Sequence, residues 1–231
     1  MKLLFLNLWH GKLIEPISDF LASQSSVDVF CFQEADAAII DHIETVLPDY
    51  VFIRAEKPID ERNAYFLATA IRSEASVITS TPVAESVDQA GFGLLVYFEY
   101  QGKQFSVLNV HGIAHVTPGM DTKQDVPSRI LQSETFLSAV SDRNNPIIIG
   151  GDFNLLPDTE SVDLFRRAGY RDLIREYSIL TTRNHLAWDR FPGEDFKYSD
   201  YVFLSPYLAV REFSVLDIEV SDHLPMIVEV E

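Results

Sequence analysis

Ile147-Ile148-Ile149-Gly150-Gly151-Asp152-Phe153-Asn154 is the stretch that decides the fold class. Three consecutive isoleucines suit a strand that is buried on both faces, as in a sheet covered by further layers. The two glycines and the polar residues after them mark the end of that strand. Polar groups at the ends of buried strands are held rigidly while they face a cleft. The stretch therefore predicts a covered sheet with a functional edge.

Other parts of the chain extend this pattern. We expect strands at residues 2–8, 27–33, 50–54, 64–72, 76–80, 93–100, 104–110, 146–150, 198–204, 210–215 and 226–230. Apolar residues at helical spacing predict helices just after Pro16 and at residues 36–47, 127–140 and 159–168. The strands between residues 50 and 110 follow one another with little helix between them, so the sheets must be mixed. We expect one α/β (α+β) domain over residues 1–231, with two packed mixed sheets flanked by helices.

The composition limits the classes of partner. The chain has 231 residues and a formal net charge of -17. Such a charge opposes non-specific binding to nucleic acid backbones and anionic membranes. No apolar run approaches the roughly 18 residues that a bilayer span needs, so we expect no membrane span and, by default, a cytoplasmic protein. The single cysteine, Cys31, excludes an intrachain disulfide and is expected to be a buried thiol.

Several polar residues follow strand-like runs. Asn7, Glu34 and His111 each close one such run, and Asp152 closes the isoleucine strand. Carboxylate and amide oxygens, with a second carboxylate from Asp222, are ligands that Mg²⁺ or Mn²⁺ prefers. Zinc is disfavoured because the sequence has no Cys/His cluster. Taken singly, each of these residues is also explained by an ordinary turn or strand end.

The motifs are more specific together than singly. In chain order they are Leu6-Asn7-Leu8-Trp9, Phe32-Gln33-Glu34, Asn109-Val110-His111-Gly112, Gly151-Asp152-Phe153-Asn154, Ser199-Asp200-Tyr201-Val202-Phe203 and Ser221-Asp222-His223-Leu224-Pro225. This series resembles the endonuclease/exonuclease/phosphatase superfamily over nearly the whole chain. The resemblance implies a deoxyribonuclease I-like, four-layer sandwich. It also implies a divalent-metal-dependent hydrolase that cleaves a phosphodiester or phosphomonoester by in-line attack of water.

The resemblance also implies a metal site. Glu34 is expected to be the main ligand of Mg²⁺ or Mn²⁺, with Asn7 assisting it. Asp222 is expected close to the same ion or to a second one. Such an ion polarises the phosphate and stabilises the leaving oxygen.

The remaining motif residues are expected to carry the catalytic chemistry. Asp152 matches the residue that positions or deprotonates the attacking water, and Asn154 matches an amide that binds the phosphoryl oxygens. His223 is expected to pair with Asp200, which orients its ring. His111 is expected to contact the phosphate or the leaving group. Whether Asp152 or His223 is the base stays open.

Substrate recognition is the least determined feature. We expect two loops, residues 115–125 and 182–192, to contact substrate, the second through Arg183, Asn184 and Trp188. The acidic charge and the lack of long basic loops favour a small or soluble phosphoester. The alternatives are a DNA or RNA nuclease with a local basic groove, a sphingomyelinase-like phosphodiesterase, and a catalytically silent binding module of the same fold. Ser199 stands where the family usually has a larger aliphatic residue, which is expected to loosen packing around Asp200.

Overall fold

Strand β8 (Ile147–Asp152) lies inside the second of two six-stranded sheets in the computed structural model. The structure describes residues 1–231 except 59–63, 86–90, 115–122 and 191–196. The first sheet has the order β11 (Val210–Val215), β12 (Met226–Val230), β1 (Lys2–Asn7), β2 (Val29–Ala35), β4 (Ala64–Arg72), β3 (Tyr50–Pro58). The second has the order β5 (Ser76–Val83), β6 (Phe92–Tyr100), β7 (Lys103–His111), β8, β10 (Asp200–Leu204), β9 (Arg171–Asp172).

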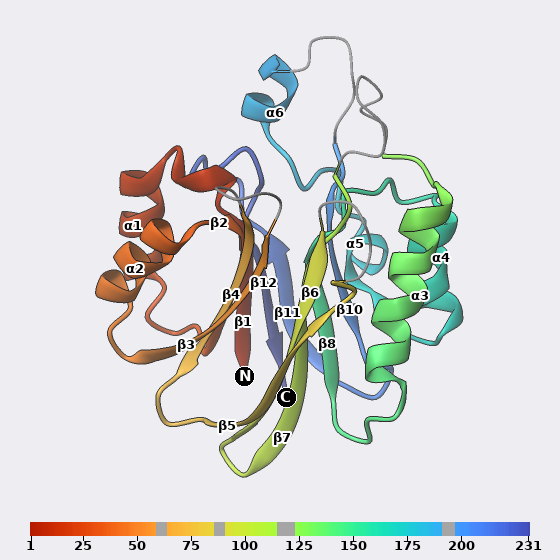
Figure 1. Ribbon diagram of the computed structural model, residues 1–231, viewed down its shortest axis with the longest axis horizontal. Helices are drawn as coiled ribbons and strands as arrows, with labels where there is room; N and C mark the ends of the chain where they lie inside the picture. Colours follow the sequence, from red (N-terminus) through yellow and green to blue (C-terminus); the bar gives the residue numbers. More distant parts are fainter. Residues whose placement is uncertain (59–63, 86–90, 115–122, 191–196) are drawn as a thin grey trace.

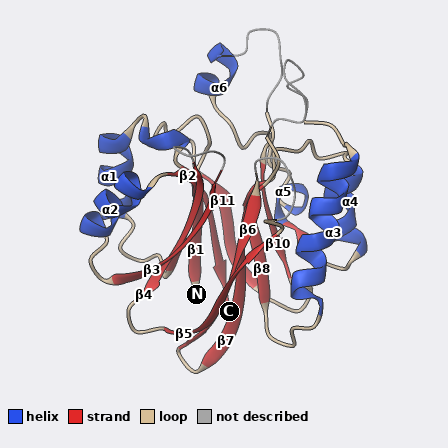
Figure 2. Cartoon of the chain, in the orientation of Figure 1, coloured by secondary structure: helices blue, strands red, loops and turns tan. Residues whose placement is uncertain are grey.

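Helices cover the outer face of each sheet, so the molecule has four layers (Figures 1 and 2). The first sheet is covered by α1 (Ile14–Ser23) and α2 (Ala37–Val46), which follow the short helix η1 (Trp9–Gly11). The second sheet is covered by α3 (Pro127–Ser141), α4 (Glu160–Arg167) and α5 (Leu173–Glu176). The last helix, α6 (His185–Arg190), stands apart from both layers (Figure 1). The expected sandwich of two mixed sheets flanked by helices is confirmed.

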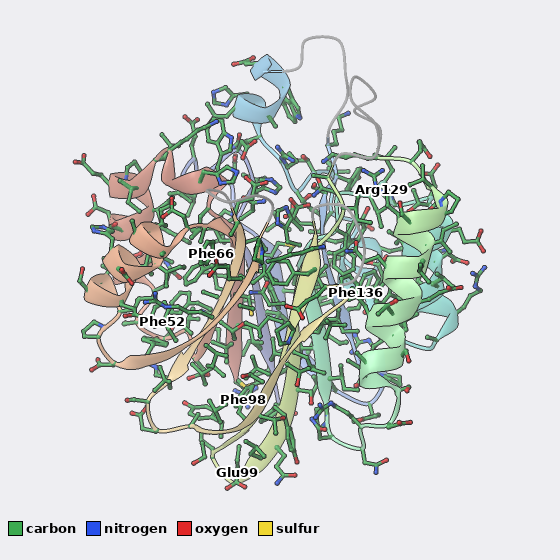
Figure 3. All side chains as sticks on the ribbon, viewed as in Figure 1. Phe52, Phe66, Phe98, Glu99, Arg129 and Phe136 are labelled. Atoms are coloured by element: carbon green, nitrogen blue, oxygen red, sulfur yellow. The ribbon has the colours of Figure 1, made fainter. Side chains whose placement is uncertain are left out.

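The two sheets pack face to face through apolar side chains. Phe5 from the first sheet and Val110 from the second belong to one buried cluster between them. Phe136 from α3 packs on the other face of the second sheet, where a Cβ atom on Gly93 would stand 3.0 Å from its ring (Figure 3). No described helix is long and apolar enough to cross a bilayer.

The two glycines before Asp152 have separate reasons. A Cβ atom on Gly150 would lie 2.7 Å from the ring of Phe5, so the close approach of the two sheets requires glycine there. Gly151 has a φ of 128°, and a Cβ atom would stand 2.3 Å from the carbonyl oxygen of Val110. Both positions bring the end of β8 close to its neighbours, which places Asp152 between the sheets.

Parallel pairing brings the expected functional edge together. Strands β1 and β2 are parallel in the first sheet, and β7 and β8 are parallel in the second. Their carboxyl ends therefore lie at one end of the molecule. The side chain of Asn7 donates a hydrogen bond to Asp152 Oδ2 at 3.0 Å, which joins the ends of β1 and β8 across the two sheets.

The structure differs from the sequence-based expectation in the short elements. All eleven expected strands are present, with ends that differ by up to four residues. Strand β9 and helix α5 were not expected. Helix α6 lies in residues 182–192, which we expected to be a loop, because Asn184 Oδ1 accepts a hydrogen bond from the backbone of Leu186 and begins a helical turn. Most of the other expected loop, residues 115–122, lies outside the described residues.

Candidate active site

Glu34 lies on an irregular part of β2. The sequence predicted that the strand would end before it, but the strand continues to Ala35 with a bulge between Phe32 and Ala35. Glu34 itself has a φ of 48°. Its carboxylate lies 3.3 Å from His10 Nε2 and 3.7 Å from His111 Nε2. With 19% of its side chain exposed, Glu34 presents oxygens to the space at the strand ends.

Asp152 is buried, and both of its oxygens accept hydrogen bonds. Its Oδ1 accepts from the backbone N–H of Asn154 at 2.9 Å and from the Ser199 hydroxyl at 2.7 Å. Its Oδ2 accepts from Asn7 and lies 3.6 Å from His223 Nε2. A buried carboxylate needs such partners, because an unpaired buried charge is strongly unfavourable. The carboxylate is therefore held in one orientation.

His223 stands between two carboxylates. Its Nδ1 lies 2.9 Å and 3.0 Å from the two oxygens of Asp200, and both side chains are buried. With Nδ1 facing a carboxylate, the ring carries its proton there and directs Nε2 toward Asp152. The structure thus pairs His223 with Asp200, as expected from the sequence.

The charges in this cluster shift the ionisation of its members. Burial raises the pKa of Asp152, but the positive charges of His223, His111, Lys123 and Arg183 outweigh burial and hold that pKa below its ordinary value. Burial and Arg183 oppose protonation of His223, but Asp200 and Asp152 outweigh them and raise the pKa of His223. An anionic Asp152 therefore faces a ring whose cationic form persists to higher pH than that of an ordinary histidine.

A cation could be held at the edge of this cluster. One ligand atom each from Glu34, Asp152 and His223 lies within 4.8 Å of the others. Of the metal ligands expected from the sequence, Glu34 belongs to this group. Asn7 adjoins it through Asp152, although its Oδ1 already accepts a hydrogen bond from the backbone of Trp9 at 2.9 Å. The carboxylate oxygens of Glu34 and Asp152 are donors of the kind that Mg²⁺ or Mn²⁺ prefers.

Asp222 lies in a different environment from the one we expected. Its Oδ2 is 2.6 Å from the guanidinium of Arg183, which also donates to the backbone carbonyl of Asp222. Its Oδ1 is 3.9 Å from His223 Nε2 and has no hydrogen-bond partner among the described residues. One oxygen of Asp222 is thus neutralised by Arg183, and the other remains available beside His223.

The two expected phosphate-binding residues border the same cluster. Asn154 has a φ of 55°, and its amide donates to the carbonyl oxygen of Gly112 at 3.3 Å. His111 is buried at the end of β7, where its register partner on β8 is Asp152. Asn154 therefore lies two residues after Asp152, and His111 lies opposite Asp152.

The expected substrate residues surround a separate hollow of about 500 Å³. Arg183, Asn184 and Trp188 all line it, together with apolar residues such as Leu224. The Asn184 amide donates to the carbonyl oxygen of Ser221, and Arg183 is occupied by Asp222. Trp188 Nε1 is buried and has no hydrogen-bond partner among the described residues. The polar groups of Arg183 and Asn184 thus bind the Ser221–Asp222 turn.

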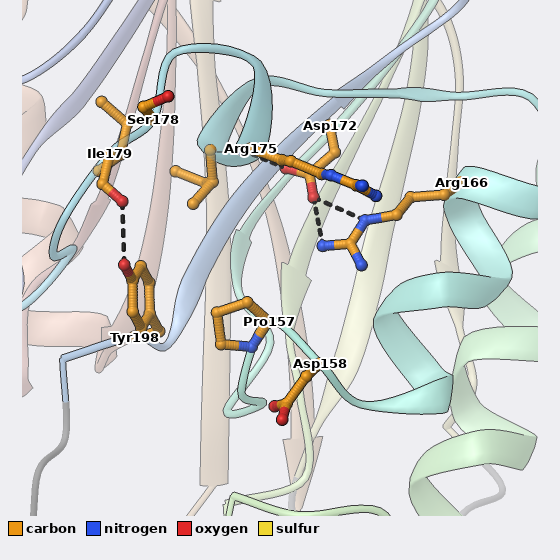
Figure 4. Close-up of a pocket in the computed structure, with 9 residues that line it drawn as sticks. Pro157, Asp158, Arg166, Asp172, Arg175, Ser178, Ile179 and Tyr198 are labelled. Atoms are coloured by element: carbon orange, nitrogen blue, oxygen red, sulfur yellow. Dashed lines mark hydrogen bonds and ion pairs between the residues drawn. The ribbon is translucent and has the colours of Figure 1, made fainter.

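A second hollow, of about 350 Å³, lies beside α5 (Figure 4). The ion pair between Arg166 and Asp172 lines it, and the Tyr198 hydroxyl donates to the carbonyl oxygen of Ile179. It contains none of the carboxylates or histidines described above.

The sequence did not predict the polar residues that contact Asp152 on the side away from His223, or that join the two sheets near it. Ser199, which we expected to loosen packing around Asp200, donates its hydroxyl hydrogen to Asp152, and its carbonyl accepts from the N–H groups of Phe153 and Asn154. The buried amine of Lys123 donates to Ser199 Oγ at 2.7 Å. Gln33 joins the sheets by donating to Asn109 Oδ1 at 2.6 Å. A serine at position 199, where the family usually has a larger aliphatic residue, was the one sequence signal for this group.

Comparison with known proteins establishes the family of the chain. The model of the endonuclease/exonuclease/phosphatase family matches residues 4–223, so the chain belongs to that family. Members of the family are generally hydrolases of phosphoester bonds and typically depend on a divalent metal. Among curated proteins, none matches the sequence.

Solved structures show the same deoxyribonuclease I-like fold. An endonuclease/exonuclease/phosphatase from Bacteroides vulgatus has a TM-score of 0.79 and 17% identity, covering 100% of this chain and 98% of its own. The human Nocturnin catalytic domain with bound sulfate has a TM-score of 0.79 and 18% identity, covering 100% and 94%. The mannosyl-6-phosphatase from Bacteroides thetaiotaomicron has a TM-score of 0.77 and 18% identity, covering 100% and 99%. At these identities the likeness establishes the fold alone.

Proposed function

We propose that this protein is a divalent-metal-dependent phosphoesterase that hydrolyses a phosphodiester or phosphomonoester by in-line attack of water. One observation carries the proposal. The buried Asp152, His223 and Asp200 form a continuous polar chain whose open end faces Glu34. A structural role alone does not explain why so many ionisable groups are buried together, whereas phosphoryl transfer requires charge placed in advance.

The metal would be Mg²⁺ or Mn²⁺. Glu34 and Asp152 would hold it through carboxylate oxygens, with Asn7 beside them. The Asp222 oxygen that lacks a hydrogen-bond partner among the described residues supports the presence of a cation near His223. When bound, such an ion polarises the phosphoryl group and stabilises charge on the leaving oxygen.

Asp152 is the residue proposed to orient the attacking water. Because its pKa is held below the ordinary value, it is a weak base and stays ionised. Its Oδ2 would accept a hydrogen bond from the water and take the proton as the new phosphorus–oxygen bond forms and the opposite phosphorus–oxygen bond, to the leaving alcohol, breaks. Asn7 and Ser199 keep the carboxylate from turning away.

His223 is proposed as a cationic donor and not as the base. Its raised pKa extends the protonated form of the ring to higher pH, and Asp200 fixes its orientation. From Nε2 it would donate to a phosphoryl oxygen as negative charge grows there. Asn154 and His111 would contribute further donors to the same oxygens.

The substrate is proposed to be a small or soluble phosphoester. The net charge of -17 opposes a long nucleic acid backbone. One structural neighbour is named as a mannosyl-6-phosphatase, which is consistent with a small phosphomonoester. A nuclease that acts on DNA or RNA is the second candidate, because the same phosphoryl chemistry serves both substrate classes.

The test is a panel of phosphomonoesters, small phosphodiesters, plasmid DNA and RNA, assayed with purified protein and Mg²⁺ or Mn²⁺. We expect hydrolysis of a small phosphoester and a loss of about 10³-fold in kcat for Asp152→Ala. Asp158→Ala, an exposed carboxylate in the following loop, is the matched control and should keep wild-type turnover.

Three outcomes would change the proposal. Cleavage of DNA or RNA with no turnover of small esters would favour the nuclease. Full activity in Asp152→Ala would contradict the assignment of Asp152 to the active site. A wild-type protein that hydrolyses none of these esters with either metal would be the silent binding module.

A further inference from the structure

A buried lysine stands behind the proposed catalytic carboxylate. Lys123 is 8% exposed, and its amine donates to Ser199 Oγ at 2.7 Å and to the carbonyl oxygen of Tyr198 at 3.1 Å. Burying an ammonium group is unfavourable unless it gains strong partners or a nearby opposite charge. Asp152 supplies that opposite charge on the far side of the Ser199 hydroxyl.

The hydrogen-bond directions in this chain of groups are determined by chemistry. An ammonium group has donors and no acceptor, so Ser199 Oγ must accept from Lys123. The single hydrogen of the Ser199 hydroxyl is then free to point at Asp152 Oδ1, which is 2.7 Å away. A carboxylate that is ionised can only accept. Ser199 therefore donates to Asp152, and Lys123 binds the same hydroxyl as a donor to its oxygen, which fixes where that oxygen lies.

This arrangement distinguishes the two oxygens of Asp152. Oδ1 accepts from the Ser199 hydroxyl and from the backbone of Asn154, so it is saturated. Oδ2 is left facing Asn7 and His223. Ser199 is fully buried, so water does not replace it as a donor. Loss of either Lys123 or Ser199 would free the carboxylate to rotate about its Cβ–Cγ bond.

The backbone that carries Lys123 is itself fixed. The carbonyl oxygen of Lys123 accepts from the N–H of Leu156 at 3.1 Å. Two residues later, Asp125 accepts from the N–H and the hydroxyl of Ser161 at the start of α4. The backbone around Lys123 is thus fixed to the loop after Asp152 and to the start of α4. A fixed backbone allows the Lys123 amine to hold Ser199 in one place.

From this geometry we infer that Lys123 and Ser199 are positioning residues that orient Asp152, presenting Oδ2 to the attacking water and the metal. The inference rests on the proposed phosphoesterase function. Neither residue is expected to touch the substrate, since both act through the carboxylate.

The experiment compares Ser199→Ala, Ser199→Thr, Lys123→Met and the double variant Ser199→Ala/Lys123→Met. The matched control is Ser205→Ala, because Ser205 is an equally buried serine at the other end of β10 whose hydroxyl accepts from the backbone of Ile147. The measurements are kcat, KM and the Mn²⁺ dissociation constant by titration calorimetry, with thermal unfolding to establish that each variant is folded.

We expect Ser199→Ala and Lys123→Met to lower kcat by about 10- to 100-fold, as is typical for groups that orient a ligand or base from outside, with KM changed less than about threefold. Ser199→Thr keeps the hydroxyl and should recover most of kcat. The double variant should be no slower than the slower single variant, because Lys123 acts through Ser199. Ser205→Ala should keep wild-type kcat.

Two results would overturn the inference. The first is wild-type kcat in a folded Ser199→Ala or Lys123→Met protein. The second is a double variant whose losses multiply. If Ser199→Ala does not fold, Lys123→Met carries the test.

Failure of the proposed function is distinguishable from failure of this inference. A wild-type protein that hydrolyses no phosphoester contradicts the function only. Crystal structures of wild type and Lys123→Met would then still decide the inference, because we expect the Asp152 carboxylate to be turned in the variant. An unchanged orientation would overturn it.

Discussion

The two sheets contribute unlike halves to the site. On the second-sheet half, Asp152 and Asp200 are buried, and each is held by neighbouring donors. On the first-sheet half, Glu34 lies on a bulge, is 19% exposed, and has its nearest ring nitrogens at 3.3 and 3.7 Å. The second-sheet half is organised before any ligand arrives, whereas Glu34 keeps its oxygens open.

The difference has a physical reason. A buried carboxylate is stable only when its oxygens are paired, so residues that orient water or protons gain fixed partners. Glu34, the main expected ligand of the cation, instead needs lone pairs that an ion can reach from solvent. The comparison predicts that substitutions in the second-sheet half reduce turnover most, and that substitution of Glu34 acts mainly on metal affinity.

Asp200→Asn should give the largest effect among the three substitutions that compare the two halves. Without the carboxylate, the His223 ring loses its orientation, and kcat should fall by about 100- to 1,000-fold. Asp200 raises the pKa of His223, so the cationic ring is present below that raised pKa and is lost as pH rises through it. The high-pH limb of the kcat profile should therefore move to lower pH in Asp200→Asn, as measured by pH-dependent initial rates.

The matched control is Asp172→Asn, a buried carboxylate paired with Arg166 in the same sheet. This variant should lose stability but keep kcat within a few-fold of wild type, roughly the scatter of changes remote from a site. If both variants lose turnover equally, the second-sheet half acts only as a structural support.

Glu34→Gln should act mainly through the metal. The amide keeps the size of the side chain and removes its charge, so Mn²⁺ affinity should fall by about 10- to 100-fold. Saturating metal should restore much of kcat, as measured by calorimetry and by metal titration of activity. Glu15→Gln, on the exposed side of α1, is the control. An unchanged Mn²⁺ dissociation constant in Glu34→Gln would show that the first-sheet half does not bind the ion.

Gln33→Met should have the smallest effect on turnover. Gln33 donates to Asn109 between the two halves, and its loss leaves the Asn109 Oδ1 atom without that donor. We expect the free energy of unfolding to fall by about 1–3 kcal/mol, measured by urea denaturation, with kcat nearly unchanged. The control Gln104→Met, exposed on β7, should change stability by less than about 0.5 kcal/mol. A large loss of kcat in Gln33→Met would mean that the halves depend on each other.

The sequence predicted the long, regular parts of the molecule well. Continuous apolar runs such as residues 147–149 and the amphipathic stretch over α2 depend on local patterns, so the strands and main helices were found. The elements that were missed are short. Strand β9 has two residues and α5 has four, and their existence depends on neighbours that only the fold supplies.

The sequence by itself determined which chemical groups could form the site. Asn7, Glu34, Asp152 and His223 follow buried strands or a turn in a fixed order, and that order is typical of the family to which the chain belongs. Residue type and strand periodicity are local properties, and a sequence contains them directly.

The tertiary structure alone decided how those groups are partnered. It paired Asp222 with Arg183, placed Lys123 behind Ser199, and turned Glu34 outward on a bulge. These contacts join residues that are between 39 and 76 positions apart in the chain, or depend on one local irregularity in a strand. Orientation and charge pairing depend on where strands from two sheets meet, and no local pattern encodes that distance.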